Sequence, residues 1–213
     1  MVAAAEIIRL SLAVSLSATL LAGSLGIALA ALLAMTRFPL RRALIIALNA
    51  LLGLPPVVVG LALYLLLSHA GPLGGLGLLF TPAAMVLAQT LLALPIVAAL
   101  AHRVLAAAWS TYGHDLQACG ASRWQALPAL LIISHRPLAT ALLAGFGRTL
   151  SEVGAVLIVG GNIAGTTRSM TTAIALETSK GNFTLALGLG AVLLGISLAV
   201  SASVILLTED QRP

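Results

Sequence analysis

Residues 10–35 read LSLAVSLSATLLAGSLGIALAALLAM and contain no charged side chain. A helix needs about 20 predominantly apolar residues to cross the hydrocarbon core of a bilayer. The apolar core of a cleaved signal peptide is shorter, typically about 7–15 residues. The stretch therefore predicts a permanent membrane-spanning helix, which begins near Ile7.

Four further apolar segments follow, at about 43–69, 81–101, 137–159 and 183–207. Hydrophobic residues make up 60% of the chain and charged residues only 8%, whereas a soluble domain carries about 25% charged residues. We therefore expect an all-α protein. Its predicted form is a polytopic transmembrane helix bundle of about five spans, folded as a single domain over residues 1–213.

Lys and Arg are distributed unevenly among the connections between these spans. The basic residues are Arg37, Arg41 and Arg42 in the first connection, and Arg103, Arg123 and Arg136 in the third. The second connection has none, and the fourth has Arg168 and Lys180. Because Lys and Arg are enriched in cytoplasmic loops, we expect an inner-membrane protein with its N-terminus outside and its C-terminus in the cytoplasm. This bias accounts for the net charge of +5, so no nucleic-acid partner is expected.

Small residues recur at every fourth position of the first span. They are Ala18, Ala22, Gly26, Ala30 and Ala34. On a helix they form one face that allows a second helix to approach closely in lipid. An Ala-rich sequence also produces such a pattern by chance, and the residues alone do not separate the two readings.

The second span contains Pro55-Pro56 near its centre. Proline removes a backbone donor and kinks a helix, which a membrane bundle tolerates when neighbours satisfy the freed groups. The kink is read either as a packing bend or as part of a substrate path.

Residues 102–136 alternate between polar and apolar character. The stretch is long enough for two short helices, joined by a turn at Gly120-Ala121-Ser122. Ser122 is a suitable N-cap for the second helix. By its charges, this connection faces the cytoplasm.

Arg148 and Glu152 lie near the middle of the fourth span. Ionisable residues at that depth are costly and usually face the bundle interior or a water-filled path. Their i, i+4 spacing places them on one face of a helix, where they can pair. A substrate gate and a structural ion pair are both open.

A Gly-rich segment follows, with Gly160, Gly161 and Asn162 before Thr167 and Arg168. Exposed backbone N–H groups beside an arginine can cradle an anion. An ordinary external loop fits the same residue types. A short helix is expected at 170–179, within the polar connection.

Several kinds of chemistry lack their signatures in this sequence. No nucleophile motif and no Gly-x-x-x-x-Gly-Lys-Ser/Thr loop is present. The chain has one cysteine and four dispersed histidines, which predicts neither a disulfide within the chain nor a metal site. The chain is therefore expected to be no enzyme, and ATP hydrolysis, if it drives transport, belongs to another subunit.

Three stretches resemble the permease subunits of binding-protein-dependent ABC importers. They are Gly120–Trp124, Gly145–Ala155, and Val159–Ile163 together with Thr167–Gly181. The second resembles a motif of molybdate, tungstate and related permeases, and the third is most like tungstate permeases. The chain is therefore similar to the oxyanion branch of the family.

The resemblance implies a type I permease fold and a coupling loop, 102–136, that docks on an ATPase. The implied coupling residues are His114, Asp115, Gly120, Ala121, Ser122 and Arg123, although His114-Asp115-Leu116 stands where the family has Glu-Ala-Ala. The implied path or gate residues are Arg148, Glu152, Gly160, Gly161, Asn162, Thr167 and Arg168.

It also implies a homodimer, two cytoplasmic ATPase subunits that hold ATP and Mg, and an extracytoplasmic substrate-binding protein. Transport of a tetrahedral oxyanion, tungstate first and molybdate or sulfate as alternatives, would follow by ATP-driven alternating access. A secondary transporter or channel is the rival from another class. Such proteins often contain inverted repeats, and this sequence shows no convincing repeat.

Overall fold

The computed structural model describes residues 2–209, and within that range the chain is helical with no β-strand. The helices are α1 (Val2–Met35), α2 (Arg41–Ala50), α3 (Pro56–Leu67), α4 (Pro82–Ala118), α5 (Arg123–Ile133), α6 (His135–Leu150), α7 (Gly154–Gly160), α8 (Met170–Ser179) and α9 (Phe183–Glu209). Two short 3-10 turns lie at Leu51–Gly53 and Gly74–Leu76.

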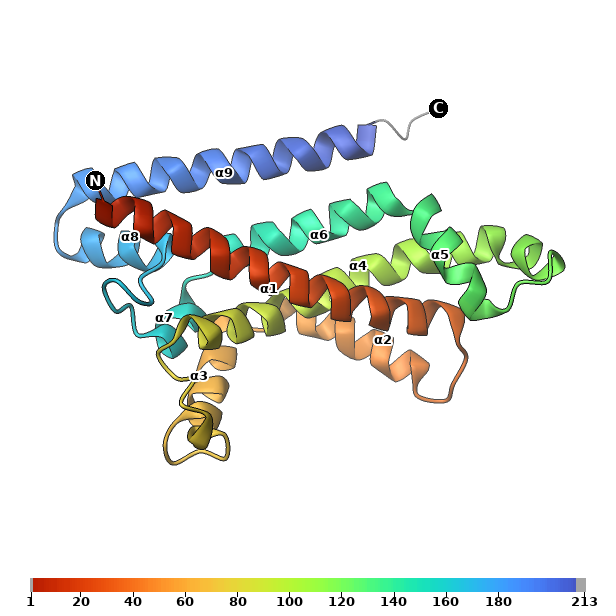
Figure 1. The fold of residues 1–213 in the computed structure, drawn as a ribbon, viewed down its shortest axis with the longest axis horizontal. Coiled ribbons are helices and arrows are strands. Elements are labelled where there is room, and N and C mark those ends of the chain that lie inside the picture. The colour runs from red at the N-terminus through yellow and green to blue at the C-terminus, as the bar shows by residue number, and fades with distance from the viewer. Residues whose placement is uncertain (1, 210–213) are drawn as a thin grey trace.

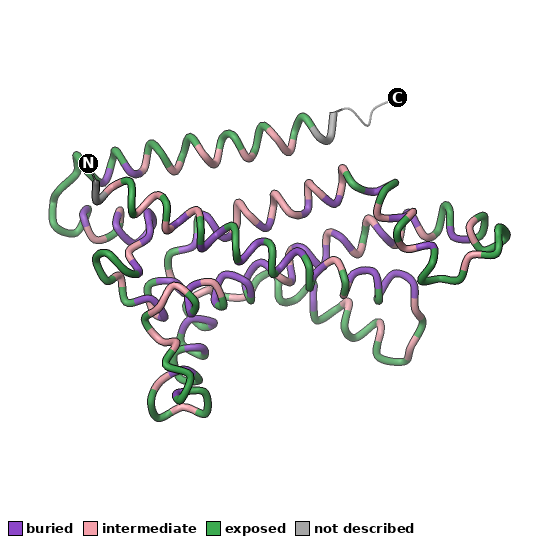
Figure 2. The backbone as a smooth tube through the Cα atoms, in the orientation of Figure 1, coloured by how far each residue is buried: buried purple, intermediate pink, exposed green. Residues whose placement is uncertain are grey.

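The long helices α1, α4, α6 and α9 run lengthwise through the molecule (Figure 1). The turn between α4 and α5 lies at one end, and α7, α8 and the start of α1 lie at the other (Figure 1). Helix α3 leaves the bundle at a steep angle. The buried residues concentrate on α1 and α4, whereas α9 is exposed along most of its length (Figure 2).

The small-residue face of α1 packs against α4. The reading of this pattern as a face for close helix approach is therefore correct. Ala18, Ala22 and Ala30 are fully buried. A Cβ atom built on Gly26 would lie 3.2 Å from the backbone nitrogen of Ala98 in α4. The pattern is therefore a helix-packing surface, because a larger side chain at these positions would separate the two backbones.

Five spans are consistent with the structure. Three helices, α1, α4 and α9, are long and apolar enough to cross a membrane. Two bent pairs raise the number to five if each pair is one span: 41–53 with 56–67, and 123–133 with 135–150. The predicted all-α transmembrane bundle is confirmed.

The second span is bent far more sharply than the predicted proline kink. Its two halves meet at 103°. Pro55 is extended, with φ −67° and ψ 122°, and Pro56 is the first residue of α3. A residue that precedes proline is disfavoured in the helical region, so α2 cannot continue through this pair.

The third span does not end near Ala101, as the sequence had suggested. Helix α4 continues without a break to Ala118. The expected first short helix of 102–136 is therefore the end of α4, and only α5 is a separate helix. The reason is that Ala106, Ala107 and Ala108 favour helix. The polar residues that follow Ala101 therefore make the surface of α4 more polar but do not end the helix.

The fourth span, expected at 137–159, is divided between α6 and α7 by residues 151–153. After it, α8 spans 170–179 as predicted. Ser169 caps α8 and forms a capping box with Thr172. The correct boundaries of α8 follow from this local signal, which needs no tertiary contact.

The crossing of α3 and α7 predicts the effect of adding one methyl group. A Cβ atom on Gly60 would lie 2.8 Å from the Cα atom of Ala155. We expect Gly60→Ala to destabilise the protein by about 1–3 kcal/mol through overpacking. The measurement is the midpoint of thermal unfolding in detergent.

Gly195→Ala is the matched control, because a Cβ atom there meets nothing within 4 Å. Alanine favours helix over glycine by about 1 kcal/mol, so this variant should unfold at the wild-type temperature or above. Equal midpoints for Gly60→Ala and Gly195→Ala would contradict the close α3–α7 contact.

Candidate functional site

The turn between α4 and α5 is built from two reinforcing helix-end motifs. At the end of α4, the N–H of Ala121 donates to the carbonyl of Leu116, and the N–H of Gly120 donates to that of Gln117. Gly120 has φ +86°, which suits glycine at this position of a Schellman motif. The sequence prediction of a turn at 120–122 is confirmed.

At the start of α5, Ser122 is the N-cap, as predicted. Its hydroxyl accepts from the N–H of Gln125, and the Gln125 side chain accepts from the N–H of Ser122. This reciprocal capping box holds the first turn of α5. The segment between the two helices therefore has little freedom to bend.

Arg123 ties this turn to the first span. Its Nη1 donates to the carbonyl oxygen of Met35, at the end of α1, over 3.2 Å. Beneath this contact, Met35, Leu105 and Leu130 are buried in one apolar cluster that joins α1, α4 and α5. The turn is therefore in direct contact with both α1 and α4.

His114 and Asp115 lie in the last turns of α4 and are exposed. Gly120 and Ser122 are exposed as well, and Ala121 is partly exposed. All six predicted coupling residues are therefore at least partly exposed, and Arg123 also has the structural contact to α1.

The Arg148–Glu152 pair forms, with 2.5 Å between Nη1 and Oε2. The residues do not share one helix, however, because Arg148 is in α6 and Glu152 lies in the break before α7. The other carboxylate oxygen of Glu152 accepts from the N–H of Ala155 over 3.0 Å. The predicted pairing is correct, but the predicted common helix face is wrong.

Exposure distinguishes the two members of this pair. Glu152 is 3% exposed and Arg148 is 29% exposed. The Thr171 hydroxyl also donates to the backbone carbonyl of Glu152. Glu152 therefore connects the α6–α7 break to α8, while the Arg148 side chain is partly exposed.

A set of buried polar side chains next to this break was not singled out from the sequence. The Thr149 hydroxyl is 3.2 Å from that of Thr19 in α1. The Gln89 side chain of α4 donates to the carbonyl of Thr149 over 3.0 Å. Isolated polar residues within apolar spans were the available signal, since such groups are usually hydrogen-bonded when buried.

Backbone and side-chain hydrogen bonds close part of the Gly-rich loop after α7. The N–H groups of Thr166, Thr167 and Arg168 all donate to the carbonyl of Ile163. The Ile163 N–H donates to the Thr167 hydroxyl, which donates in turn to the carbonyl of Gly160. Within residues 2–209, no hydrogen bond is found for the N–H groups of Asn162, Ala164 and Gly165, so the anion cradle and the ordinary loop both stay predictions.

Gly161 is required by its surroundings. It has φ +70°, and a Cβ atom on it would lie 2.8 Å from the Phe80 ring. Asn162 follows with φ +51°, a conformation that asparagine tolerates better than most residues. These two residues reverse the chain between α7 and α8.

Arg168 faces a hollow of about 400 Å³ at this end of the molecule. Gly165 and Thr166 contribute to its wall, and α1 contributes Glu6 and Arg9. Sequence reasoning had not associated Arg9 with this loop, because 159 positions separate the two arginines. The hollow has the charge and the size for a small anion.

The end of α8 holds a separate charge cluster. Glu177 accepts hydrogen bonds from Lys180 and Asn182. The bond from Lys180, followed by that from Asn182, lowers the pKa of the Glu177 carboxyl. The resulting stabilisation is present at neutral pH and is lost as the pH falls through the lowered pKa.

The predicted site residues therefore occupy three separate places. The coupling residues lie around the α4–α5 turn, Arg148 and Glu152 lie at the α6–α7 break, and the residues around Arg168 lie in the loop between α7 and α8. In the part of the chain that the structure describes, no three His, Cys, Asp or Glu side chains form a group that could hold a metal.

Comparison with known proteins gives relatives along nearly the whole chain. The tungstate uptake system permease protein TupB of Peptoclostridium acidaminophilum is 39% identical over 204 residues, covering 96% of this chain and 90% of the relative. A probable anion ABC transporter permease protein of Haloferax volcanii is 41% identical, covering 92% of this chain and 87% of the relative.

The molybdenum transport system permease protein ModB of Azotobacter vinelandii is more distant, with 33% identity over 76% of both chains. No protein-family model matches the sequence. This chain belongs to the family of ABC transporter permeases for oxyanions, which includes the tungstate and molybdenum permease proteins.

Proposed function

We propose that this chain is the membrane-spanning subunit of an ATP-driven tungstate importer. The observation that carries the proposal is the 39% identity to a tungstate permease over 96% of the chain. Molybdate is the second candidate substrate, because a molybdenum permease is 33% identical over 76% of the chain. Sulfate is a further alternative, through a sulfate permease at 29% identity.

The proposed assembly contains two copies of this chain, which form the pathway between them. Two cytoplasmic ATPase subunits bind ATP and Mg, and an extracytoplasmic binding protein delivers the anion. This chain performs no chemistry itself. The N-terminus is placed outside and the C-terminus in the cytoplasm, in agreement with the basic first and third connections.

The geometry supports a direct route for coupling. His114, Asp115 and the turn at 120–122 are exposed for contact with the ATPase. Helix α4 joins this turn to Gln89 without a break. A displacement of the turn therefore reaches Thr149, at the α6–α7 break, through the hydrogen bond from Gln89.

At the outer end, the proposed path begins at the hollow beside Arg9 and Arg168. Two arginines attract a dianion, and the nearby Glu6 limits how tightly it is held. Arg148, the partly exposed member of its pair with Glu152, is the second cation of the proposed path. Transport requires that each of these sites releases the anion as readily as it accepts it.

Reconstitution tests this function. Proteoliposomes that hold this chain and its ATPase should accumulate tungstate only with Mg-ATP and the binding protein. Arg123→Ala should lower uptake about tenfold or more, because it removes a charge-assisted hydrogen bond between the turn and α1, while ATP hydrolysis continues. Arg42→Ala, which removes an exposed charge from the same side, is the control.

Uptake by this chain alone, driven by an ion gradient, would instead identify a secondary transporter. Wild-type uptake by Arg123→Ala would remove the Arg123–Met35 contact from the coupling route. Competition by unlabelled molybdate and sulfate in the same vesicles ranks the three oxyanions.

Glu152→Ala tests whether the Arg148–Glu152 pair is a structural ion pair or part of the substrate path. It leaves Arg148 unpaired and the Ala155 N–H unsatisfied. The loss of stability should be about 3 kcal/mol, which lowers the unfolding midpoint by about 6–12 °C for a chain of this size. The double variant Arg148→Ala/Glu152→Gln removes both charges and keeps an oxygen for Ala155, so it should recover most of that loss.

Tungstate uptake by the double variant gives the second readout. If stability recovers and uptake stays impaired, the result would support a role for Arg148 in the path. If both stability and uptake recover, the pair has only a structural role. A wild-type midpoint for Glu152→Ala would contradict both roles of the carboxylate.

Arg168→Gln tests the outer hollow. We expect uptake at low tungstate concentration to fall about tenfold, because a charge-assisted contact to the anion is lost, and to recover partly at high concentration. Lys180→Gln is the control, since Lys180 lies on the same side but does not line the hollow. An equal effect of the two substitutions would contradict a specific role for Arg168.

A further inference from the structure

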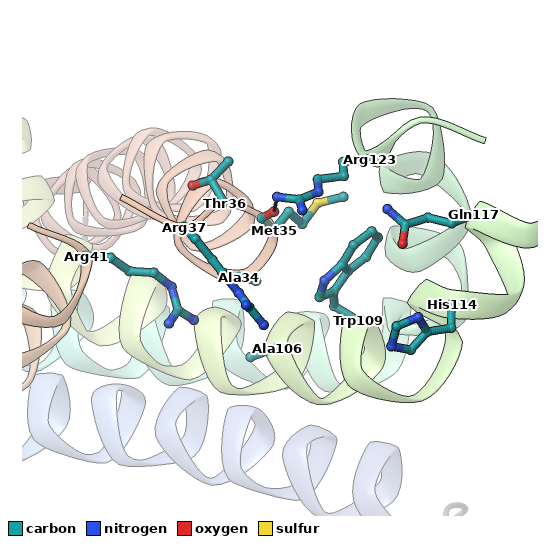
Figure 3. Close-up of a pocket in the computed structure, with 10 residues that line it drawn as sticks. All are labelled: Ala34, Met35, Thr36, Arg37, Arg41, Ala106, Trp109, His114, Gln117 and Arg123. Atoms are coloured by element: carbon teal, nitrogen blue, oxygen red, sulfur yellow. Dashed lines mark hydrogen bonds between the residues drawn. The ribbon is translucent and has the colours of Figure 1, made fainter. Parts of the chain in front are cut away.

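A second basic hollow lies at the opposite end of α1 and has no part in the path proposed above. Its volume is about 360 Å³, and it lies among the end of α1, the start of α2, α4 and α5 (Figure 3). Its polar lining includes Arg37, Arg41, Arg123, His114 and Gln117. Among the described residues no acidic side chain lines it, so none of them neutralises the charge of the three arginines within the hollow.

Two of these arginines are held in place by α1. The Nε of Arg41 donates to the carbonyl of Leu33 over 2.6 Å, and Arg123 donates to that of Met35. These carbonyls belong to the last turn of α1 and have no partner within the helix. Because a guanidinium has five N–H donors, each arginine keeps donors for a ligand.

Arg37 differs from them, because it makes no hydrogen bond or ion pair with any residue that the structure describes. Figure 3 shows its side chain extending across the hollow toward Ala106, beside the indole of Trp109. A positive charge that reaches over a hollow without a protein partner is placed to meet an external anion.

The depth of the hollow matches the edge of a bilayer. Met35 is the last residue of the first candidate span, and Trp109 contributes an indole ring of the kind enriched at membrane interfaces. A smaller hollow of about 270 Å³ adjoins it and shares Arg37, Trp109, His114 and Gln117. Together they offer more room than a bare tetrahedral anion needs.

The surface beside Arg37 and Arg41 is apolar and uncovered. Leu40 is 68% exposed and Leu44 is 41% exposed. A soluble anion gains nothing from such residues, whereas the acyl chains of a lipid pack against them. Basic pockets between helices at the cytoplasmic leaflet are known to hold anionic headgroups.

We propose that the hollow bounded by Arg37, Arg41, Arg123 and Trp109 binds the phosphate headgroup of an anionic phospholipid in the leaflet at the C-terminal end of α1. Under the orientation proposed above, this is the cytoplasmic leaflet. The arginines hold the phosphate, Trp109 lies at the level of the glycerol, and the acyl chains lie along Leu40 and Leu44. The lipid thereby connects α1, α2 and the coupling turn.

Native mass spectrometry of the full chain in detergent tests this site, with dioleoyl-phosphatidylglycerol and dioleoyl-phosphatidylcholine as probes. The wild type should retain phosphatidylglycerol in preference to phosphatidylcholine. Arg37→Gln should weaken phosphatidylglycerol binding about tenfold, because one charge-assisted contact is lost. Arg42→Gln, an exposed change in the same connection that does not line the hollow, should bind as the wild type does.

Thermal unfolding gives an independent readout. Without lipid, Arg37→Gln should unfold at the wild-type temperature, since Arg37 has no internal partner to lose. Phosphatidylglycerol should raise the midpoint of the wild type and of Arg42→Gln, but not that of Arg37→Gln. These lipid measurements involve no transport, so they stand or fall separately from the importer function.

Three outcomes would overturn the proposal. The first is a lack of selectivity: the wild type retains the two lipids equally, or the wild type and Arg37→Gln retain phosphatidylglycerol equally. Another is displacement of the lipid by millimolar tungstate or inorganic phosphate, which would assign the hollow to a soluble anion. The third is displacement by the ATPase subunit, which would assign it to acidic residues of that partner.

Discussion

The close contact between α1 and α4 is the interaction on which the rest of this structure depends. Hydrocarbon supplies no hydrophobic force between two apolar helices, so their association depends on packing distance and hydrogen bonds. Gly26 and its neighbouring alanines allow the backbones to approach. Helix α4 then contacts α2, α3, α5, α6 and α7, and its position determines where those elements lie.

Broken spans are possible in this bundle because buried polar groups satisfy the exposed backbone. A helix interrupted within a membrane leaves N–H and C=O groups that water cannot reach. At the α6–α7 break, Glu152 accepts from Ala155 and Thr171 donates to the carbonyl of Glu152. The buried carboxylate of Glu152 thus satisfies a backbone N–H group at the break, and its partner Arg148 is proposed to meet the anion.

The arginines at the two ends of α1 illustrate two uses of one residue type. Near the start of α1, Arg9 and Arg168 face a hollow and are proposed to receive the oxyanion. At its end, Arg41 and Arg123 donate to unpaired carbonyls of the helix. The second arrangement also connects the proposed ATPase-docking turn to a span, so one contact stabilises a helix end and links it to the coupling turn.

The sequence by itself determined the features that depend on local chemistry. Apolar length predicted the spans, the Gly120–Ser122 pattern predicted the turn, and the short helix at 170–179 was predicted within the polar connection. The motifs at 120–124, 145–155 and 159–181 also indicated the family, because they resemble those of oxyanion permeases. These properties depend on neighbours a few residues apart, so a single chain is sufficient to read them.

Only the tertiary structure decided which distant residues meet. It placed Arg9 beside Arg168, joined Arg123 to Met35 and brought Gln89 to Thr149. It also showed that α4 continues past Ala101, that the second span bends by 103° and that Glu152 lies outside a helix. The physical reason is that helix breaks and buried polar contacts are stabilised by partners on other helices, and the linear pattern does not specify those partners.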